Sequence, residues 1–372
     1  MIINIIFILL LVVLCVAIFR FFAKKSNGLY TNILLFGVSI VHFFIFVYRF
    51  FYLNIDAGDS RRFYDVASQS TDWFSLYGIG NKSMPFLLYP FVKTGISYFS
   101  LSLLFSILSF MGYLIYFKIL TKNISNKTLL EKTLIALFFI IPSLHFWTVS
   151  ISKEAIIFLL MAMVFEKINN LKFSNLNIIA SIVIILFIRP YLAAILMFPL
   201  IILNFKNFSF KYKIIITSIL AVSVPVILNF LRISSLESLK SNYLKVILFA
   251  KENGSSSINL LDNNYLERVF LVLFRPLFYD AQTILQYLVS FENAIWIILF
   301  VIFILLLKNK PTVFKSMIFK FLIIYVISVL AFYSIYMYNL GLASRMRVMF
   351  MPYAMISLIL LSNSSEKKYN NF

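Results

Sequence analysis

The sequence predicts an all-α, polytopic transmembrane helical bundle with about eleven spans. Of its 372 residues, 62% are hydrophobic and 13% are charged, whereas soluble globular proteins carry about 25% charged residues. Runs of about 20 apolar residues, the length that crosses a bilayer as a helix, recur from one end of the chain to the other. The alternating segments of about ten residues that are typical of an outer-membrane barrel do not occur. We therefore expect a single integral membrane domain over 1–372.

Each expected span is an apolar run bounded by polar or basic residues. The eleven runs are 2–19, 32–51, 96–117, 133–146, 155–165, 176–188, 191–203, 214–231, 294–307, 318–337 and 348–361. The first run has no basic region before it and no small-residue cleavage site after it, so we expect a retained helix and not a signal peptide. The short apolar segment 85–92 is expected to be re-entrant or to lie at the membrane interface.

The distribution of lysine predicts the orientation. Lys24 and Lys25 follow the first run, and positively charged loops remain in the cytoplasm. Alternating the spans from this point places the N-terminus outside and the C-terminus in the cytoplasm. Two long polar regions, about 54–84 and 232–268, then become outer loops. The scheme requires that 269–290 does not cross, and the Arg, Asp and Gln residues of that segment suit a re-entrant or surface position.

Arginine and lysine separate in this topology. The loops assigned to the cytoplasm carry lysine and, apart from Arg20, no arginine. The other arginines lie on or near the outer face, where they oppose the orientation signal; they are Arg49, Arg61, Arg62, Arg189, Arg232, Arg268, Arg275, Arg345 and Arg347. Guanidinium groups suit bidentate recognition of phosphate or carboxylate. The pattern therefore predicts an outward-facing polar cavity for an anionic, lipid-linked substrate.

Composition and missing motifs exclude several function classes. The net charge of +19 comes mostly from lysines of the inner loops, and no soluble basic domain is present to hold nucleic acid. The single Cys15 excludes an intrachain disulfide. The sequence has no Walker motif, no glycine-rich nucleotide loop and no cluster with metal-ligand spacing. We expect no cofactor, no metal and no chemistry fed by ATP or a cytoplasmic nucleotide sugar.

The first outer region carries the first candidate residues. Asp59 is a candidate base or metal ligand, and Arg61 and Arg62 are candidate phosphate ligands. The alternative is a solvated loop whose charges pair with one another. A second group, His145 and Lys153, lies where one span leaves the outer face and the next enters, although such residues also serve as helix-end caps.

Four more arginines and two carboxylates complete the candidates. Arg189 precedes a proline between two apolar runs, and a charge at membrane depth marks a functional site unless it snorkels to the interface. Arg275 also precedes a proline, and Asp280 and Glu292 either orient it or supply a catalytic carboxylate. The last outer turn adds two arginines. The candidates of this group are Arg189, Arg275, Asp280, Glu292, Arg345 and Arg347.

The order of these motifs resembles a known family. DAGDSRRFYDVA is followed by PSLHFWTVSISKE, IRPY, FRP, SFEN and SRMR before a late Pro-Tyr. Together they are similar to the O-antigen or capsule repeat-unit polymerases (Wzy-like) and related GT-C-type membrane glycosyltransferases of bacteria. The resemblance implies glycosyl transfer from a polyprenyl-diphosphate-linked oligosaccharide, outside the cytoplasm, in the inner (plasma) membrane. Membrane lipid, a chain-length regulator and a flippase are the implied partners.

The resemblance also implies residue roles. Arg189, Arg275, Arg345 and Arg347 would hold diphosphate. Asp59 would match the first-loop acid that acts as base, a role for which Asp56 and Asp65 compete. Three alternatives stay open: a flippase for the same lipid-linked unit, a transferase that adds one sugar, and a non-catalytic membrane partner. The lack of an internal repeat and the gathering of polar residues at one face favour the enzyme over the transporter.

Overall fold

The computed structural model describes residues 2–24, 28–53, 58–169, 175–204, 263–337 and 339–363, with isolated residues between 210 and 241. The regular secondary structure of the described residues is helical, so the all-α part of the predicted fold class is confirmed. The chain divides into two compact units. Unit 1 is Met1–Pro190 with Asn371–Phe372, and unit 2 is Tyr191–Asn370. Most of the expected span 214–231 and of the expected outer loop 232–268 lies outside the described residues.

Among the described residues, six helical segments are long and apolar enough to cross a membrane, as expected of a membrane protein. They are Ile2–Ala23, Leu29–Tyr52, Tyr98–Leu120, Leu129–Thr148, Ile284–Asn309 and Met317–Ile335. A pair bent by 56°, Leu340–Met349 and Met351–Ser362, gives a seventh if it forms one span. Helix α9 (Leu176–Ile188) has 13 residues and so measures about 20 Å, less than the hydrocarbon core of about 30 Å. The expected number of eleven is therefore not confirmed.

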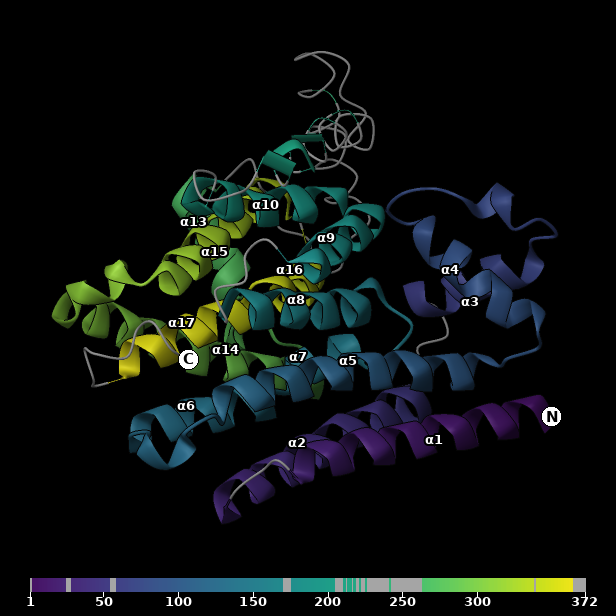
Figure 1. Cartoon of the computed structure of the whole chain (residues 1–372), viewed down its shortest axis with the longest axis horizontal. Helices are drawn as coiled ribbons and strands as arrows, with labels where there is room; N and C mark the ends of the chain where they lie inside the picture. The colour runs from purple at the N-terminus through teal and green to yellow at the C-terminus, as the bar shows by residue number, and fades with distance from the viewer. Residues whose placement is uncertain are drawn as a thin grey trace. The chain divides into compact units, whose positions relative to one another are not determined.

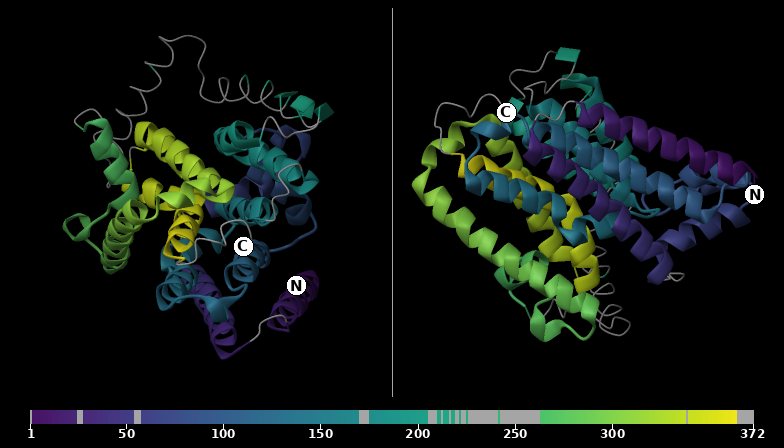
Figure 2. Two further views of the ribbon diagram at one scale, coloured as in Figure 1. Left: turned by 60° about the vertical axis from the view of Figure 1, so that its left-hand side comes forward. Right: turned by 90° about the horizontal axis from the view of Figure 1, so that it is seen from below.

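In unit 1, three long helices lie side by side: α1 (Ile2–Ala23), α2 (Leu29–Val47) and α5 (Tyr98–Leu120) (Figures 1 and 2). Helix α5 forms the centre of the unit because it also packs along α8 (Lys153–Asn169). Gly112 makes this close approach possible, since a Cβ atom there would lie 2.8 Å from the Phe158 ring and 3.1 Å from the Leu159 Cα. In the sequence, two short helices lie between α5 and α8: α6 (Leu129–Ile140) and α7 (Pro142–Thr148).

Residues 58–84, the described part of the expected outer region 54–84, contain one helix and the start of a second. Helix α3 (Asp59–Gln69) places Phe63 and Ala67 one turn apart on one face, and both are buried. They pack against Met84 and Leu88 of α4 (Ser83–Lys93), which contains the short apolar segment 85–92. The polar residues of the stretch hid an amphipathic helix, because two buried apolar positions in eleven residues are a weak signal.

Unit 2 contains α10 (Pro190–Asn204, without its first residue), α13 (Tyr265–Phe274), α14 (Ile284–Asn309), α15 (Met317–Tyr336), α16 (Leu340–Met346) and α17 (Met351–Ser362). The segment 269–290, expected to be re-entrant or at the surface, contains the end of α13, a break and the start of α14. Helix α13 ends at Phe274, and α14 begins ten residues before the expected span at 294. A capping box between Thr283 and Gln286 starts α14. Its polar residues Glu292 and Asn293 face the interior, which hid the span from a count of apolar residues.

Candidate functional site

The first candidate site lies at the start of α8, within unit 1. Lys153 and Glu154 open this helix, and the Ser152 hydroxyl accepts a hydrogen bond from the Ala155 N–H at 3.2 Å. The same hydroxyl donates to the Trp147 carbonyl at 3.2 Å, which ties the helix start to the end of α7. Lys153 is 6% exposed and Glu154 is fully buried. The sequence placed both at a helix entry, and the structure turns both inward.

Two polar side chains from other elements meet this helix start. The Lys153 ammonium donates to Asn81 Oδ1, and the Arg189 guanidinium forms an ion pair with Glu154. The turn before α4 is held to the end of α9 by a hydrogen bond from Gly80 N to Phe187 O at 3.0 Å. Three segments far apart in the sequence therefore form one cluster, which we call the α8 cluster: the buried Lys153, Glu154 and Arg189, and the exposed Asn81.

The charged residues of α3 are more exposed than the α8 cluster. Arg61 forms an ion pair with Asp65 at 3.1 Å, one helical turn away, and both side chains are about 40% exposed. Arg62 and Asp59 are exposed. The Phe63 ring lies 5.9 Å from the Lys153 Nζ, so α3 borders the α8 cluster through this aromatic face. For Arg61, the geometry favours the alternative to phosphate binding, in which the charged residues of this region pair with one another.

His145 lies where a substrate would not reach it. The side chain is fully buried, and its Nδ1 lies 3.0 Å from Nδ1 of His42, which is also fully buried. The expected role of His145 as a substrate ligand is therefore not the role its position supports. His42 lies on α2, and 103 positions separate it from His145.

The second candidate site lies in unit 2, at the break between α13 and α14. Arg275 Nε donates to Asp280 Oδ2 at 2.9 Å, and Arg275 Nη2 donates to Asp280 Oδ1. The Leu277 N–H donates to the same carboxylate at 2.8 Å. Burial alone would raise the pKa of Asp280, but the hydrogen bonds from Arg275 and Leu277 and the charge of Arg275 outweigh burial and lower this pKa below its usual value. Of the two predicted roles, the geometry favours Asp280 as the residue that orients Arg275.

Arg347 fixes the backbone beneath Arg275. Its Nε donates to the Val272 carbonyl at 2.8 Å, its Nη1 to Asn293 Oδ1 and its Nη2 to the Arg275 carbonyl. Asn293 Nδ2 in turn donates to the Pro276 carbonyl at 2.6 Å. Arg347 is 2% exposed, so these contacts favour a positioning role over the expected contact with diphosphate.

The remaining candidates of unit 2 lie close by in the sequence. Glu292, beside Asn293, is 8% exposed and accepts a hydrogen bond from Trp296 Nε1 at 3.5 Å. It lies on the interior face of α14 and contributes negative charge near the buried Arg347. Arg345 belongs to α16 and is half-buried. We call Arg275, Asp280, Asn293 and Arg347 the Arg275 cluster.

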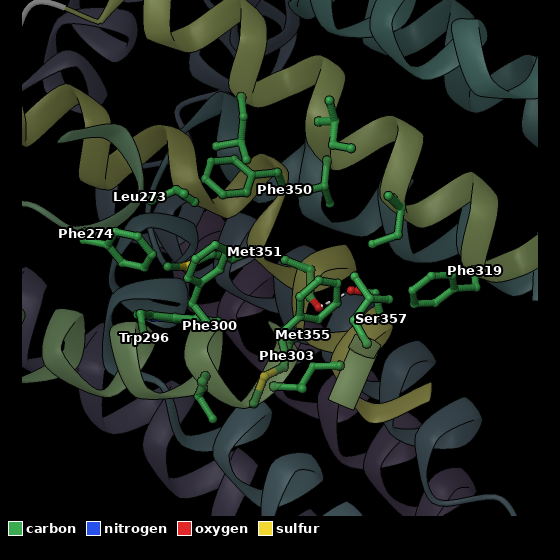
Figure 3. Close-up of a pocket in the computed structure, with 18 of the residues that line it drawn as sticks. Leu273, Phe274, Trp296, Phe300, Phe303, Phe319, Phe350, Met351, Met355 and Ser357 are labelled. Carbon is green, nitrogen blue, oxygen red and sulfur yellow. Dashed lines mark hydrogen bonds between the residues drawn. The ribbon is translucent and has the colours of Figure 1, made fainter. Parts of the chain in front are cut away.

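An apolar cavity of about 390 Å³ adjoins the Arg275 cluster (Figure 3). Phe274, the residue before Arg275, forms part of its wall. The side chains that surround it come from α13, α14, α15 and α17; those labelled in Figure 3 include Phe274, Trp296, Phe303, Phe319, Phe350 and Met355. Ser357 also lines the cavity, and its hydroxyl donates to the Ala354 carbonyl at 2.6 Å. The lining therefore offers apolar contacts and almost no hydrogen-bonding groups.

Comparison with known proteins gives no family. No family model, no curated protein and no solved structure matches the chain. Within the described residues, no group of three or more His, Cys, Asp or Glu side chains is arranged to hold a metal ion. The function is therefore argued from the side chains of the two sites.

Sequence reasoning found most charged members of the two sites and missed their amide partners. Asn81 and Asn293 carry no charge and stand in ordinary sequence contexts, although Asn293 closes the SFEN motif. Each becomes notable only through its contact with Lys153 or Arg347. Asn293 is buried on α14, whereas Asn81 is exposed in the turn before α4.

Proposed function

We propose that this protein is a membrane glycosyltransferase that polymerises polyprenyl-diphosphate-linked oligosaccharide repeat units on the extracytoplasmic face of the membrane. The product would be an O-antigen, a capsule or an exopolysaccharide. This proposal keeps the eleven spans, the outside N-terminus and the cytoplasmic C-terminus that the lysine pattern predicts. The bacterial inner membrane is the proposed location, with a flippase and a chain-length regulator as partners.

One observation carries the proposal: an arginine held in a fixed orientation stands next to an apolar cavity. Asp280 engages Nε and Nη2 of Arg275, while Nη1 makes no hydrogen bond to any residue that the structure describes. The Arg275 side chain is 25% exposed, whereas Asp280 is 7% exposed. A lipid diphosphate needs both features, a rigid cationic donor for its phosphates and an apolar surface for its hydrocarbon chain.

The chemistry requires little beyond positioning and charge stabilisation. The acceptor hydroxyl attacks the anomeric carbon of the donor sugar, the bond from this carbon to the diphosphate oxygen breaks, and the hydroxyl proton passes to a base. Arg275 would stabilise the negative charge that develops on the departing diphosphate. Both oxygens of Asp280 accept hydrogen bonds from Arg275, so Asp280 is a poor base.

Removal of the gene from its host tests the activity. A surface glycan that collapses on a gel from a ladder to core plus one repeat unit would support polymerisation, because units are still made and exported. Loss of the unit, with no single-repeat band, would contradict it and indicate a flippase or an earlier transferase.

Substitution of Arg275 tests the site. Arg275→Ala should abolish the ladder at unchanged protein level, and Arg275→Lys should restore little, since an ammonium cannot donate bidentately to Asp280 while facing a phosphate. Arg20→Ala is the matched control, because Arg20 is exposed on α1 and is assigned to the cytoplasm. A normal ladder from Arg275→Ala would exclude this residue from the site.

A further inference from the structure

The two histidines of the chain form one buried pair within unit 1. His42 lies on α2 and His145 on α7, and their Nδ1 atoms are 3.0 Å apart. Tyr113 of α5 stacks on the His145 ring at a centroid distance of 4.2 Å. Neither the α8 cluster nor the Arg275 cluster uses these imidazoles, so the pair needs its own explanation.

Each imidazole is held by a backbone carbonyl at its other nitrogen. His145 Nε2 lies 2.9 Å from the Phe139 carbonyl, and His42 Nε2 lies 2.9 Å from the Ser106 carbonyl. A carbonyl oxygen only accepts, so each contact favours a proton on Nε2. With both Nε2 atoms protonated and both rings neutral, the two Nδ1 lone pairs would face each other at 3.0 Å. A proton on one of the two Nδ1 atoms removes this repulsion, whether it is an additional proton or has moved there from Nε2.

The separation of 3.0 Å decides which species fits. A hydrogen bond between two nitrogens needs about 3 Å. A metal ion bound to two imidazoles at about 2.05 Å would hold the nitrogens about 3.3 Å apart in a tetrahedral site and about 4 Å apart in a linear one. The described residues also supply no third ligand. The spacing therefore fits a proton and is too short for a metal.

Ser106 allows the pair to exist with or without the additional proton. Its hydroxyl lies 3.1 Å from His42 Nε2, close to the carbonyl contact of the same residue. In the cationic state, His42 donates from Nδ1 to His145 and from Nε2 to the Ser106 carbonyl. In the neutral state, His42 keeps its Nδ1 proton, and its bare Nε2 accepts from the Ser106 hydroxyl. One residue thus provides an acceptor for one state and a donor for the other.

The pair lies deep within the candidate spans. The rings of Phe50 and Phe99 are 4.9 Å apart, so the end of the span Leu29–Tyr52 meets the beginning of α5. His42 lies ten residues before Tyr52 and so about 15 Å from that end, half of a hydrocarbon core of about 30 Å. Ionisable residues at this depth are costly and mark proton or ion pathways.

In the part of the chain that the structure describes, the groups that contact the pair are hydroxyls, aromatic rings and backbone carbonyls. Helix α5 contributes Ser106, Ser109, Phe110 and the titratable Tyr113, while α2 contributes Phe43. Helix α6 contributes the Phe139 carbonyl. Within the described residues, neither ring has an ion pair with an acidic side chain. The charge state of the pair is therefore set by the two imidazoles and the Ser106 groups.

We propose that His42 and His145 form a proton-binding site inside the membrane-spanning helices, which takes up one proton between its two imidazoles. Ser106 stabilises the empty state through its hydroxyl and the occupied state through its carbonyl. The second proton is excluded, because two imidazolium rings at this distance repel each other. The proposal is independent of glycosyl transfer.

Selective ¹⁵N labelling of histidine tests it directly, since the chain has two histidines. The full-length protein, purified through a tag without histidine and placed in nanodiscs, is titrated between pH 4 and 9 while long-range ¹H–¹⁵N correlations report the protonation of all four ring nitrogens. We expect both rings to shift together with one midpoint and the uptake of one proton per chain. Separate midpoints, uptake of two protons, or rings that stay unchanged over the whole range would each overturn the proposal.

A serine substitution keeps both histidines and tests the role of Ser106 in the neutral state of the pair. Ser106→Ala removes the donor of the neutral state, so the midpoint should rise by about 0.5–1 pH unit, the equivalent of one neutral hydrogen bond. Ser102→Ala is the matched control, because Ser102 is buried on the same helix and its hydroxyl contacts no described partner. Equal midpoints in the wild type and Ser106→Ala would remove Ser106 from the site. Addition of one equivalent of Zn²⁺ should leave the spectra unchanged, and stoichiometric changes would instead assign a metal site.

Discussion

Variants of the buried ion pair between Glu154 and Arg189 distinguish a structural role of this arginine from a role in substrate binding. Glu154 is fully buried and the Arg189 side chain is 7% exposed, so water screens neither charge. Glu154→Gln keeps the shape of the side chain but leaves the guanidinium without a counter-charge. Removal of one partner of a buried pair costs about 3–5 kcal/mol, because the remaining charge stays desolvated.

The double variant Glu154→Gln/Arg189→Met should recover most of this loss. Replacement of both members of a buried pair by uncharged residues of similar volume is often neutral or stabilising. For unit 1, the single substitution should lower the unfolding midpoint by roughly 6–20 °C, and the double variant should return close to the wild type. Thermal unfolding of the purified protein in detergent, followed by intrinsic fluorescence, measures both effects.

The same variants then report on function. If Arg189 holds diphosphate, the double variant is stable but makes no polymer in the host. If Arg189 only neutralises Glu154, the double variant restores both stability and polymer. A double variant that is as unstable as the sum of the two single variants would refute the description of Glu154 and Arg189 as a coupled pair.

Two further predictions concern unit 2. Because the pKa of Asp280 is lowered, the stability that its pair with Arg275 contributes is complete above the ordinary value of 3.8 and is lost as the pH falls through the lower folded-state pKa. The free energy of unfolding, measured between pH 3 and 7, should therefore decline only at the acid end. Asp280→Asn should remove this part of the decline. Ala354→Trp places an indole in the apolar cavity, so binding of a lipid-linked substrate should weaken by tenfold or more while the unfolding midpoint stays within about 2 °C of the wild type. Unchanged binding by this variant, measured with a fluorescent polyprenyl diphosphate, would place the hydrocarbon chain elsewhere.

The sequence determined the features that depend on neighbouring residues. Apolar runs of spanning length predicted a helical membrane protein, and several expected spans match helices within a few residues, such as 318–337 in α15. Charged residues in unusual places, such as Lys153, Arg189 and Arg347, were found because charge at membrane depth is costly wherever the chain folds. The expected orientation also depends on local charge and stays a prediction.

Predictions failed where a polar residue is buried against a partner. The polar stretch 54–84 contains α3, in which the residues that are not buried outnumber the buried ones. Helix α14 begins before the expected span because Glu292 and Asn293 turn inward, and a count of apolar residues treats such positions as loop. Arg347, expected to bind diphosphate, donates hydrogen bonds to two backbone carbonyls and to Asn293.

The tertiary structure alone decided which residues meet. His42 and His145 are 103 positions apart, and nothing in either neighbourhood points to the other. Asn81 reaches Lys153 across 72 positions for the same reason. Local patterns fix how a segment lies in water or lipid, because transfer free energy depends on each side chain separately. Hydrogen bonds between distant side chains depend on which helix faces pack together, and this choice is made only when the whole unit folds.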